Sequence, residues 1–203
     1  MKQEVRIEFE QLEIFRSKKR WKLYFIILAE HPSDPDKWVL TSIPNDDTGV
    51  IELKPNAENK IYFEPQVGVG VDGLFVFNRE MPKNRRLKVR VYLRHSRSSI
   101  RNVGELLSDV EKTLGDNAFG QVTNLLGRSN PWLVISKEAA QKVGSILKNV
   151  KDKDFGMLSL DEEFGKEFDN QEELDRENRF STGDARLVWS WAIRNIDPNE
   201  STT

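Results

Sequence analysis

Apolar residues recur at every second position through most of the first 97 residues, and this spacing constrains the fold more than any other feature of the sequence. Val5, Ile7 and Phe9 alternate with charged residues, and residues 87–93 repeat the pattern. A period of two places successive side chains on opposite faces of a strand. Short strands separated by turn-rich loops are typical of antiparallel sandwiches and barrels.

Two of the predicted strands have distinctive patterns. Residues 21–29 are apolar at both odd and even positions, which indicates a central strand covered on both faces. The alternation over residues 5–14 changes phase near Glu10 and Gln11, which predicts a β-bulge. Further strands are predicted at 38–43, 50–53, 60–63, 74–77, 87–93, 155–160 and 185–193.

Helical spacing of apolar residues begins after residue 97. Residues 100–114 form one stripe, with Ser98 or Ser99 as the N-cap, and Ser136 opens a second stripe over 137–150. A shorter helical piece is predicted over 118–126. The final strand has bulky residues on one face and small ones on the other, so we expect a closely packed neighbour, such as one of these helices, against its small face.

The composition excludes several classes of protein. The chain has no cysteine, which rules out disulfides, thiolate nucleophiles and Cys-ligated zinc. It has no window of 18 apolar residues, and its start, MKQEVRIEFEQ, lacks the apolar region of a signal peptide. We therefore expect a soluble, cytoplasmic protein without a transmembrane segment.

The residues form no coherent catalytic constellation. Residues 68–73 match the glycine spacing of dinucleotide-binding loops, but a predicted strand follows them where that motif requires a helix. His31 and His95 are the two histidines, and no pair is singled out among the 33 acidic residues. The sequence favours a non-catalytic protein and leaves a carboxylate-based hydrolase as an alternative.

A basic block is the strongest charge feature. Residues 83–101 carry eight Lys or Arg residues and no acid. In the predicted strand, one face carries Arg86, Lys88, Arg90, Tyr92 and Arg94. We expect this row to face solvent and to need anions nearby, which protein carboxylates, phosphates or a lipid surface can supply. It is the predicted face for an anionic ligand or a partner.

An acidic segment balances the basic block. Residues 151–184 carry five basic and twelve acidic residues, so the net charge of −2 conceals a strong asymmetry. Phe164, Phe168 and Leu174 are apolar positions that should fix this segment to the body of the protein. We interpret residues 161–177 as a flap that closes over the basic strand as an electrostatic clasp.

Asp-rich loops offer a candidate calcium site. Asp34 and Asp36 lie in one loop between predicted strands, and Asp46 and Asp47 lie in the next. Calcium prefers several oxygen ligands of this kind. The layout loosely resembles that of C2-type sandwiches, and this resemblance implies calcium held between Asp-rich loops and lipid binding. Because a single strand joins the two loops, they should emerge at opposite ends of the sheet, which argues against one shared site.

The predicted fold is an antiparallel β-sandwich of about eight strands, loosely C2-like or jelly-roll-like, with two helices inserted before the final strands. Residues 1–203 form a single domain. Its parts are the main strands (1–97), a helical insertion (98–150), the acidic flap and closing Trp strand (151–196) and a flexible tail (197–203).

Three functions remain open at this point. The first is a non-catalytic interaction module that docks on a protein partner or on itself. The second is a calcium- or phosphate-dependent domain that binds a membrane or another anionic ligand; nucleic acid is less favoured, because the chain is not basic overall. The third is the carboxylate-based hydrolase. The sequence implies no cofactor other than calcium.

Overall fold

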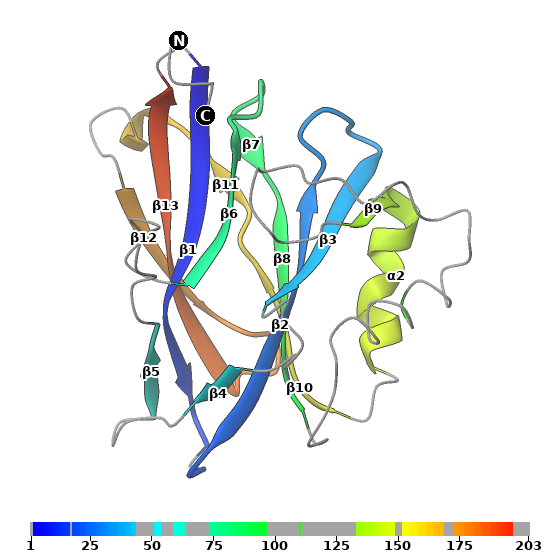
Figure 1. The fold of residues 1–203 in the computed structure, drawn as a ribbon, viewed down its shortest axis with the longest axis vertical. Coiled ribbons are helices and arrows are strands. Elements are labelled where there is room, and N and C mark those ends of the chain that lie inside the picture. The colour runs from blue at the N-terminus through cyan, green and yellow to red at the C-terminus, as the bar shows by residue number, and fades with distance from the viewer. Residues whose placement is uncertain are drawn as a thin grey trace.

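Two antiparallel β-sheets face each other, and a helix lies on the outer side of one of them (Figure 1). The structure is a computed structural model that describes residues 2–16, 18–43, 51–53, 59–63, 74–96, 110, 133–148, 152–168 and 173–196. The mainly β, sandwich-like class predicted from the sequence is confirmed. The described residues form thirteen strands, more than the eight expected.

The first sheet is built around the long N-terminal strand. Its order is β12 (Glu173–Arg179), β13 (Ala185–Ile196), β1 (Lys2–Ile14) and β5 (Lys60–Tyr62), and β6 (Leu74–Glu80) also pairs with β1. We call it sheet A. The predicted bulge is confirmed, because the register between β1 and β13 shifts between Phe9 and Gln11.

The second sheet, sheet B, is built around β2. Its order is β10 (Lys153–Ser159), β8 (Val89–His95), β2 (Trp21–Glu30), β3 (Lys37–Ile43) and β9 (Leu133–Ser136), and β4 (Ile51–Leu53) also pairs with β2. A short pair of strands, β7 (Arg86–Leu87) and β11 (Glu162–Glu163), precedes the 3-10 helix η2 (Lys166–Phe168). The central position predicted for residues 21–29 is confirmed.

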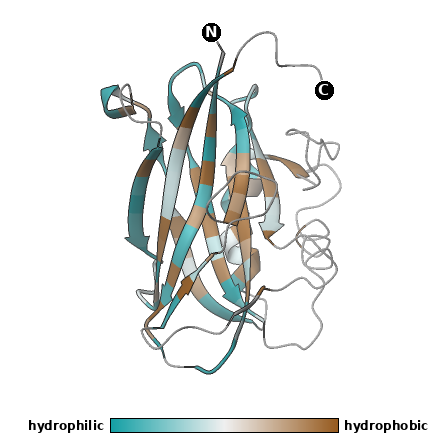
Figure 2. Ribbon diagram, turned by 60° about the vertical axis from the view of Figure 1, so that its left-hand side comes forward, coloured by the Kyte–Doolittle hydropathy of each residue, from teal (hydrophilic) through white to brown (hydrophobic). Residues whose placement is uncertain are grey.

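Apolar side chains fill two layers, one on each face of β2. Trp21, Phe25 and Ile27 belong to the main core between the sheets. Tyr24 and Ile26 belong to a second cluster between sheet B and helix α2 (Lys137–Lys148). Bands of hydrophobic and hydrophilic residues alternate along the long strands (Figure 2). The residues of β2 are therefore apolar at both odd and even positions because both faces of the strand are buried.

The segment predicted as a helical insertion (98–150) contains both a strand and a helix. Ser136 caps α2 as expected, because its Oγ accepts a hydrogen bond from the Ala139 amide at 3.2 Å. The preceding residues 133–136 form β9 and extend sheet B, a strand that the sequence reading missed. Of the helix predicted over 100–114, the structure describes Val110, which is helical and buried in the second cluster. The predicted piece at 118–126 and the tail at 197–203 lie outside the described residues.

The closing strand β13 has the predicted two-faced character. Leu187, Trp189 and Trp191 are buried in the main core, and Ser190 and Ala192 on the small face are also buried. The suggested helix neighbour is wrong for α2, which contacts β3 and β9 of the opposite sheet. No helix among the described residues is long and apolar enough to cross a membrane.

Candidate functional site

The predicted basic row on β7 and β8 begins with exposed, paired cations. Arg86 Nη2 lies 3.0 Å from Glu163 Oε2, and both side chains are more than half exposed. Lys88 Nζ lies 3.8 Å from Glu30 Oε1, and the Lys88 amide donates to Glu30 Oε2 at 3.3 Å. Protein carboxylates therefore accompany this end of the row.

The row then passes beneath the second apolar layer. The Arg90 guanidinium lies over the Trp38 ring, 5.1 Å from its centroid, and both side chains are at least partly buried. Tyr92 packs under α2, where a Cβ added at Gly144 would lie 3.1 Å from the Tyr92 hydroxyl oxygen. Burial raises the pKa of Tyr92 above its usual value, with a smaller opposing effect from Arg90. The prediction that the row faces solvent is therefore wrong for Tyr92, because α2 covers it.

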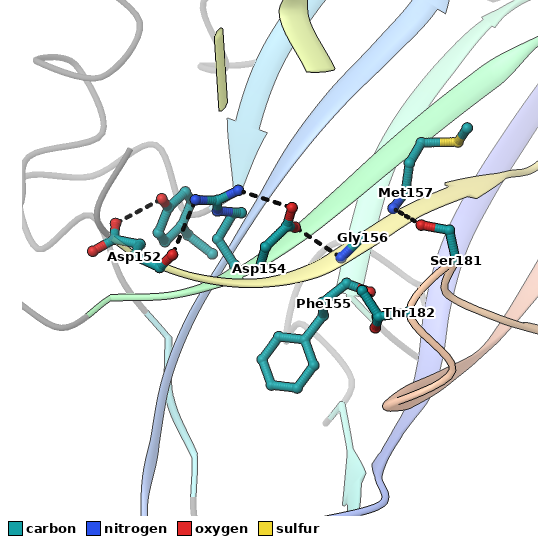
Figure 3. A network of polar contacts seen from close by, with 9 residues as sticks. Asp152, Asp154, Phe155, Gly156, Met157, Ser181 and Thr182 are labelled. Atoms are coloured by element: carbon teal, nitrogen blue, oxygen red, sulfur yellow. Dashed lines mark hydrogen bonds and ion pairs between the residues drawn. The ribbon is translucent and has the colours of Figure 1, made fainter. Parts of the chain in front are cut away.

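At its far end the row is fully buried. Arg94 is 1% exposed, with Nη1 3.3 Å from Asp154 Oδ2 and Nη2 donating to the Asp152 carbonyl at 3.1 Å. The Tyr24 hydroxyl donates to Asp152 Oδ2 at 2.8 Å (Figure 3). Arg94 therefore joins β8 to β10 from within and is not accessible to a ligand. The five predicted residues run from solvent to core and do not form one binding surface.

The network around Asp154 also holds an irregularity in β10. The β10–β8 register shifts between Asp154 and Met157, and Gly156 has a φ of 90°. Asp154 Oδ1 accepts the Gly156 amide at 2.8 Å, and Ser181 Oγ accepts the Met157 amide at 3.0 Å (Figure 3). The Ser181 amide in turn donates to the Met157 carbonyl at 3.0 Å. The turn between β12 and β13 thereby fastens sheet A to the edge of sheet B.

The acidic segment is not a flap over the basic strand. It forms β11, η2 and β12, and β12 is the edge strand of sheet A, paired with β13. Phe164 and Phe168 are buried in the main core, as their apolar character suggested. Among the ion pairs of the described residues, the predicted flap (161–177) meets the basic row at Glu163 and Arg86, whereas Asp154, which pairs with Arg94, precedes the flap. The clasp is therefore reduced to one exposed pair.

The candidate calcium ligands are only partly described. Asp34 Oδ1 accepts the Asp36 amide at 3.0 Å, and Asp34 Oδ2 lies 3.1 Å from Lys37 Nζ. These bonds, led by that of the Asp36 amide, hold the pKa of Asp34 below its usual value. Asp46 and Asp47 lie outside the described residues, and no group of three potential metal ligands occurs within the described ones. The calcium site remains a prediction.

Carboxylates relevant to the hydrolase alternative gather at another place. Glu10, Glu173 and Asp175 line an open pocket of about 550 Å³ with Tyr62 and Phe63. Burial raises the pKa of Glu10, a hydrogen bond from Ser190 opposes it, and the charges of Asp175 and Glu173 raise it further. The pocket is acidic, and nothing in its geometry singles out a reaction.

The sequence reading missed a second concentration of positive charge at the end of the sandwich where β1 and β2 join. It includes Arg16, Lys18, Lys19, Arg20, Lys22, Lys153 and Arg179, which we call the basic end. Lys18, Lys19 and Arg20 are exposed in the β1–β2 connection. Arg16 Nη2 pairs with Asp184 Oδ2 at 2.8 Å, and the Phe15 amide donates to the Asp184 carbonyl at 2.9 Å. The start of β13 thus anchors the connection.

Aromatic rings bring the cations of the basic end together. Lys18 Nζ and Lys153 Nζ lie 5.1 Å and 5.3 Å from the centroid of the Trp21 ring, which is 2% exposed. The electron-rich face of an indole attracts ammonium groups, so the ring holds two like charges near each other. Arg179 lies 4.8 Å from the centroid of Phe15, which is 41% exposed.

His95 completes the basic end without adding charge. Its Nε2 lies 2.5 Å from Lys18 Nζ, and its ring meets Trp21 edge-on with centroids 5.1 Å apart. Burial lowers the pKa of His95, and the charges of Lys18 and Lys153 lower it further, against a bond to the Lys22 backbone that raises it. The neutral imidazole can accept a hydrogen bond from the Lys18 ammonium.

A local signal for the basic end was present in the sequence. Residues 16–22 contain five Lys or Arg residues and no acid. Acidic residues outnumber basic ones over residues 1–82 as a whole, so the net charge of that long region does not reveal the cluster. A seven-residue window would have found it, but the contributions of Lys153 and Arg179 depend on the fold.

Comparison with known proteins adds no family to these observations. A scan of protein families found no match to the chain, and a search of curated proteins found none either. The functional argument therefore rests on the geometry of the sites.

Proposed function

We propose that this protein is a non-catalytic interaction module that docks through its basic end on an acidic surface of a partner protein. The observation that carries the proposal is the exposed cluster of Lys18, Lys19 and Arg20 on a connection anchored at both sides. Complementary charge steers association and selects partners, and exposed cations at an interface rim act mainly in this way. Such a module would work in the cytoplasm, as the sequence predicts.

The aromatic residues favour a protein surface over nucleic acid. Proteins that bind single-stranded nucleic acid present exposed rings on which bases stack. Here Trp21 is 2% exposed and lies beneath Lys18 and Lys153, so its ring supports the cations and leaves no free face for a base. The exposed Phe15 ring beside these cations has the Arg179 guanidinium 4.8 Å from its centroid, so the basic end offers mainly charge and little surface on which a base could stack.

An anionic membrane is the second candidate partner, because of Phe15. This ring is 41% exposed and lies among cations at the end of the sandwich. An apolar ring beside Lys and Arg residues suits the boundary between anionic headgroups and acyl chains, where each cation contributes about 1 kcal/mol.

A charge-reversal experiment tests the proposal. The variant K18E/K19E/R20E is compared with K142E/K148E/K166E, which changes three exposed lysines elsewhere by the same total charge. Binding is measured to poly-glutamate and to phosphatidylserine vesicles at two salt concentrations. We expect the first variant to lose about tenfold in affinity and the control to lose less than about threefold, since each exposed pair contributes about 0.2–1 kcal/mol.

The outcomes separate the candidates. Binding to poly-glutamate that depends on the basic end supports the protein partner, and binding to vesicles alone supports the membrane. Equal losses of affinity in both variants would show that binding depends only on the net charge of the protein, and would reject the basic end as a site. Absence of binding to both probes would reject the proposal.

A further inference from the structure

A pocket lies at the opposite end of the sandwich from the basic end. It has a volume of about 500 Å³ and lies between the loop after β2 and the loop after β6. Its lining includes Arg79 and Lys83 together with Glu30, His31 and Pro82. Because β2 begins at Trp21 in the basic end and finishes at Glu30 in this pocket, the two sites are about 30 Å apart.

Arg79 occupies a position that an apolar residue would normally take. It is in register with Val5 of β1, whose side chain belongs to the main core, and only 5% of Arg79 is exposed. Arg79 Nη1 donates to the main-chain carbonyl of Glu30, so the side chain crosses from sheet A to sheet B. A guanidinium therefore closes the core at this end.

The charge of Arg79 is only partly compensated. No carboxylate forms an ion pair with it among the described residues, and its Nε is buried without a hydrogen-bond partner. The nearby Glu30 carboxylate is engaged by Lys88, through both its ammonium and its amide. Burial lowers the pKa of Arg79 to about 10, against the opposing charge of Glu30. A buried cation without a closely paired anion is costly, which favours an oxyanion beside it.

The turn after β6 places a second cation, Lys83, at the rim of the pocket. Arg85 has a φ of 53°, and its amide donates to the Pro82 carbonyl at 2.8 Å. The Arg85 guanidinium is tied on the other side, with Nε donating to the Phe164 carbonyl at 2.6 Å. These bonds fix the turn that presents the exposed Lys83, for which the structure shows no ion pair with any described residue.

The acidic groups of the lining are largely occupied by partners. Asp34 is bound to Lys37 and to the Asp36 amide, and Glu30 is bound to Lys88. Glu80, which is exposed, is the remaining carboxylate of the lining. Among the charged residues of the lining, Arg79 and Lys83 are therefore cations without an ion pair to a described residue, and Glu80 is the carboxylate that remains to balance them.

We propose that this pocket binds a compact oxyanion, a phosphate or a carboxylate group, between the buried Arg79 guanidinium and the Lys83 ammonium. Planar guanidinium groups match the oxygens of both anions, and a lysine at the rim adds a movable charge. The site is independent of the proposed docking through the basic end and has its own ligand.

Titration of the full chain with inorganic phosphate, sodium acetate and sodium chloride at equal ionic strength tests the site. The readouts are the thermal unfolding midpoint and calorimetric heats. We expect phosphate or acetate to raise the midpoint in a saturable way, as a ligand of the native state must, while chloride does not. The stronger of the two identifies the chemical class of the ligand.

Variants decide between a binding site and a structural tie. R79Q should abolish the saturable response, and K83E, which changes an exposed turn residue, should weaken it about tenfold while the protein stays folded. K18E/K19E/R20E should leave the response unchanged. A response that is absent in the wild type, unchanged in K83E, or lost with the basic-end variant would overturn the oxyanion site, whether or not R79Q folds.

Discussion

The ammonium of Lys18 lies 2.5 Å from Nε2 of His95, across 77 positions of sequence. This contact joins the β1–β2 connection to the end of β8, and the imidazole must remain neutral to accept a hydrogen bond from the ammonium. Both residues lie against Trp21: the Lys18 ammonium lies over its ring, and the imidazole makes a T-shaped contact with it. The Trp21 ring and the His95 imidazole therefore hold the Lys18 cation of the basic end in place.

Removing the Lys18 charge should raise the pKa of His95. The wild-type pKa lies below 6.5, mainly through burial, and Lys18 adds to the shift. Because the folded-state pKa is below the unfolded one, His95 costs no stability above the unfolded pKa, and stability falls as pH drops through 6.5 toward the folded pKa. K18Q should reduce this loss.

An NMR titration of the two histidine side chains measures the effect. His31 is the internal control, since Asp34, Arg79 and Lys37 are the charged groups that influence its pKa. A His95 pKa that stays the same or falls in K18Q would contradict the proposed arrangement.

The two ends of the predicted basic row should differ in their contribution to stability. D154A removes the carboxylate beside the 1% exposed Arg94 and the acceptor of the Gly156 amide, so we expect a loss of about 2–4 kcal/mol. E163A breaks the exposed pair with Arg86 and should cost less than about 1 kcal/mol. Urea unfolding of both variants provides the comparison, and equal losses would contradict the burial gradient along the row.

Two glycines with positive φ isolate the contact between β10 and the β12–β13 turn. A Cβ at Gly156 would lie 2.2 Å from Ser181 Oγ and 3.0 Å from the Thr182 amide nitrogen, whereas a Cβ at Gly183 would meet nothing within 4 Å. G183A should show only the conformational cost, about 1–2 kcal/mol. G156A should cost at least about 1 kcal/mol more, because the turn must move. Similar unfolding free energies would show that the turn is not tightly fastened to β10.

Local patterns predicted the sheets well because each depended on residues close in sequence. The phase change near Glu10 predicted the bulge in β1, and the double parity of residues 21–29 predicted a strand between two apolar layers. The Ser136 cap fixed the start of α2. The strand β9 was missed because four residues directly before a helix are too few to show the alternation that marks a strand.

The sites were harder to predict because their environment comes from distant segments. The alternation on β8 identified which residues share a face, but the position of α2 covers Tyr92, and Arg94 is buried with Asp152 and Asp154 as its partners. Arg79 lies beyond the strand predicted at 74–77, and its burial follows from the longer β6 that brings it to the Glu30 carbonyl of the other sheet. Charge counted over long blocks also hid the five cations of residues 16–22.

The most direct test of the central claim is to map the binding surface on the full chain by backbone amide chemical shifts during titration with poly-glutamate. The account predicts the largest changes at residues 15–22, at His95 and Lys153, and at residues 179–184, which together make up the basic end and its anchor. The changes should fade as salt is raised. Changes confined to Arg86, Lys88 and Arg90, or to the exposed face of α2, would contradict the claim.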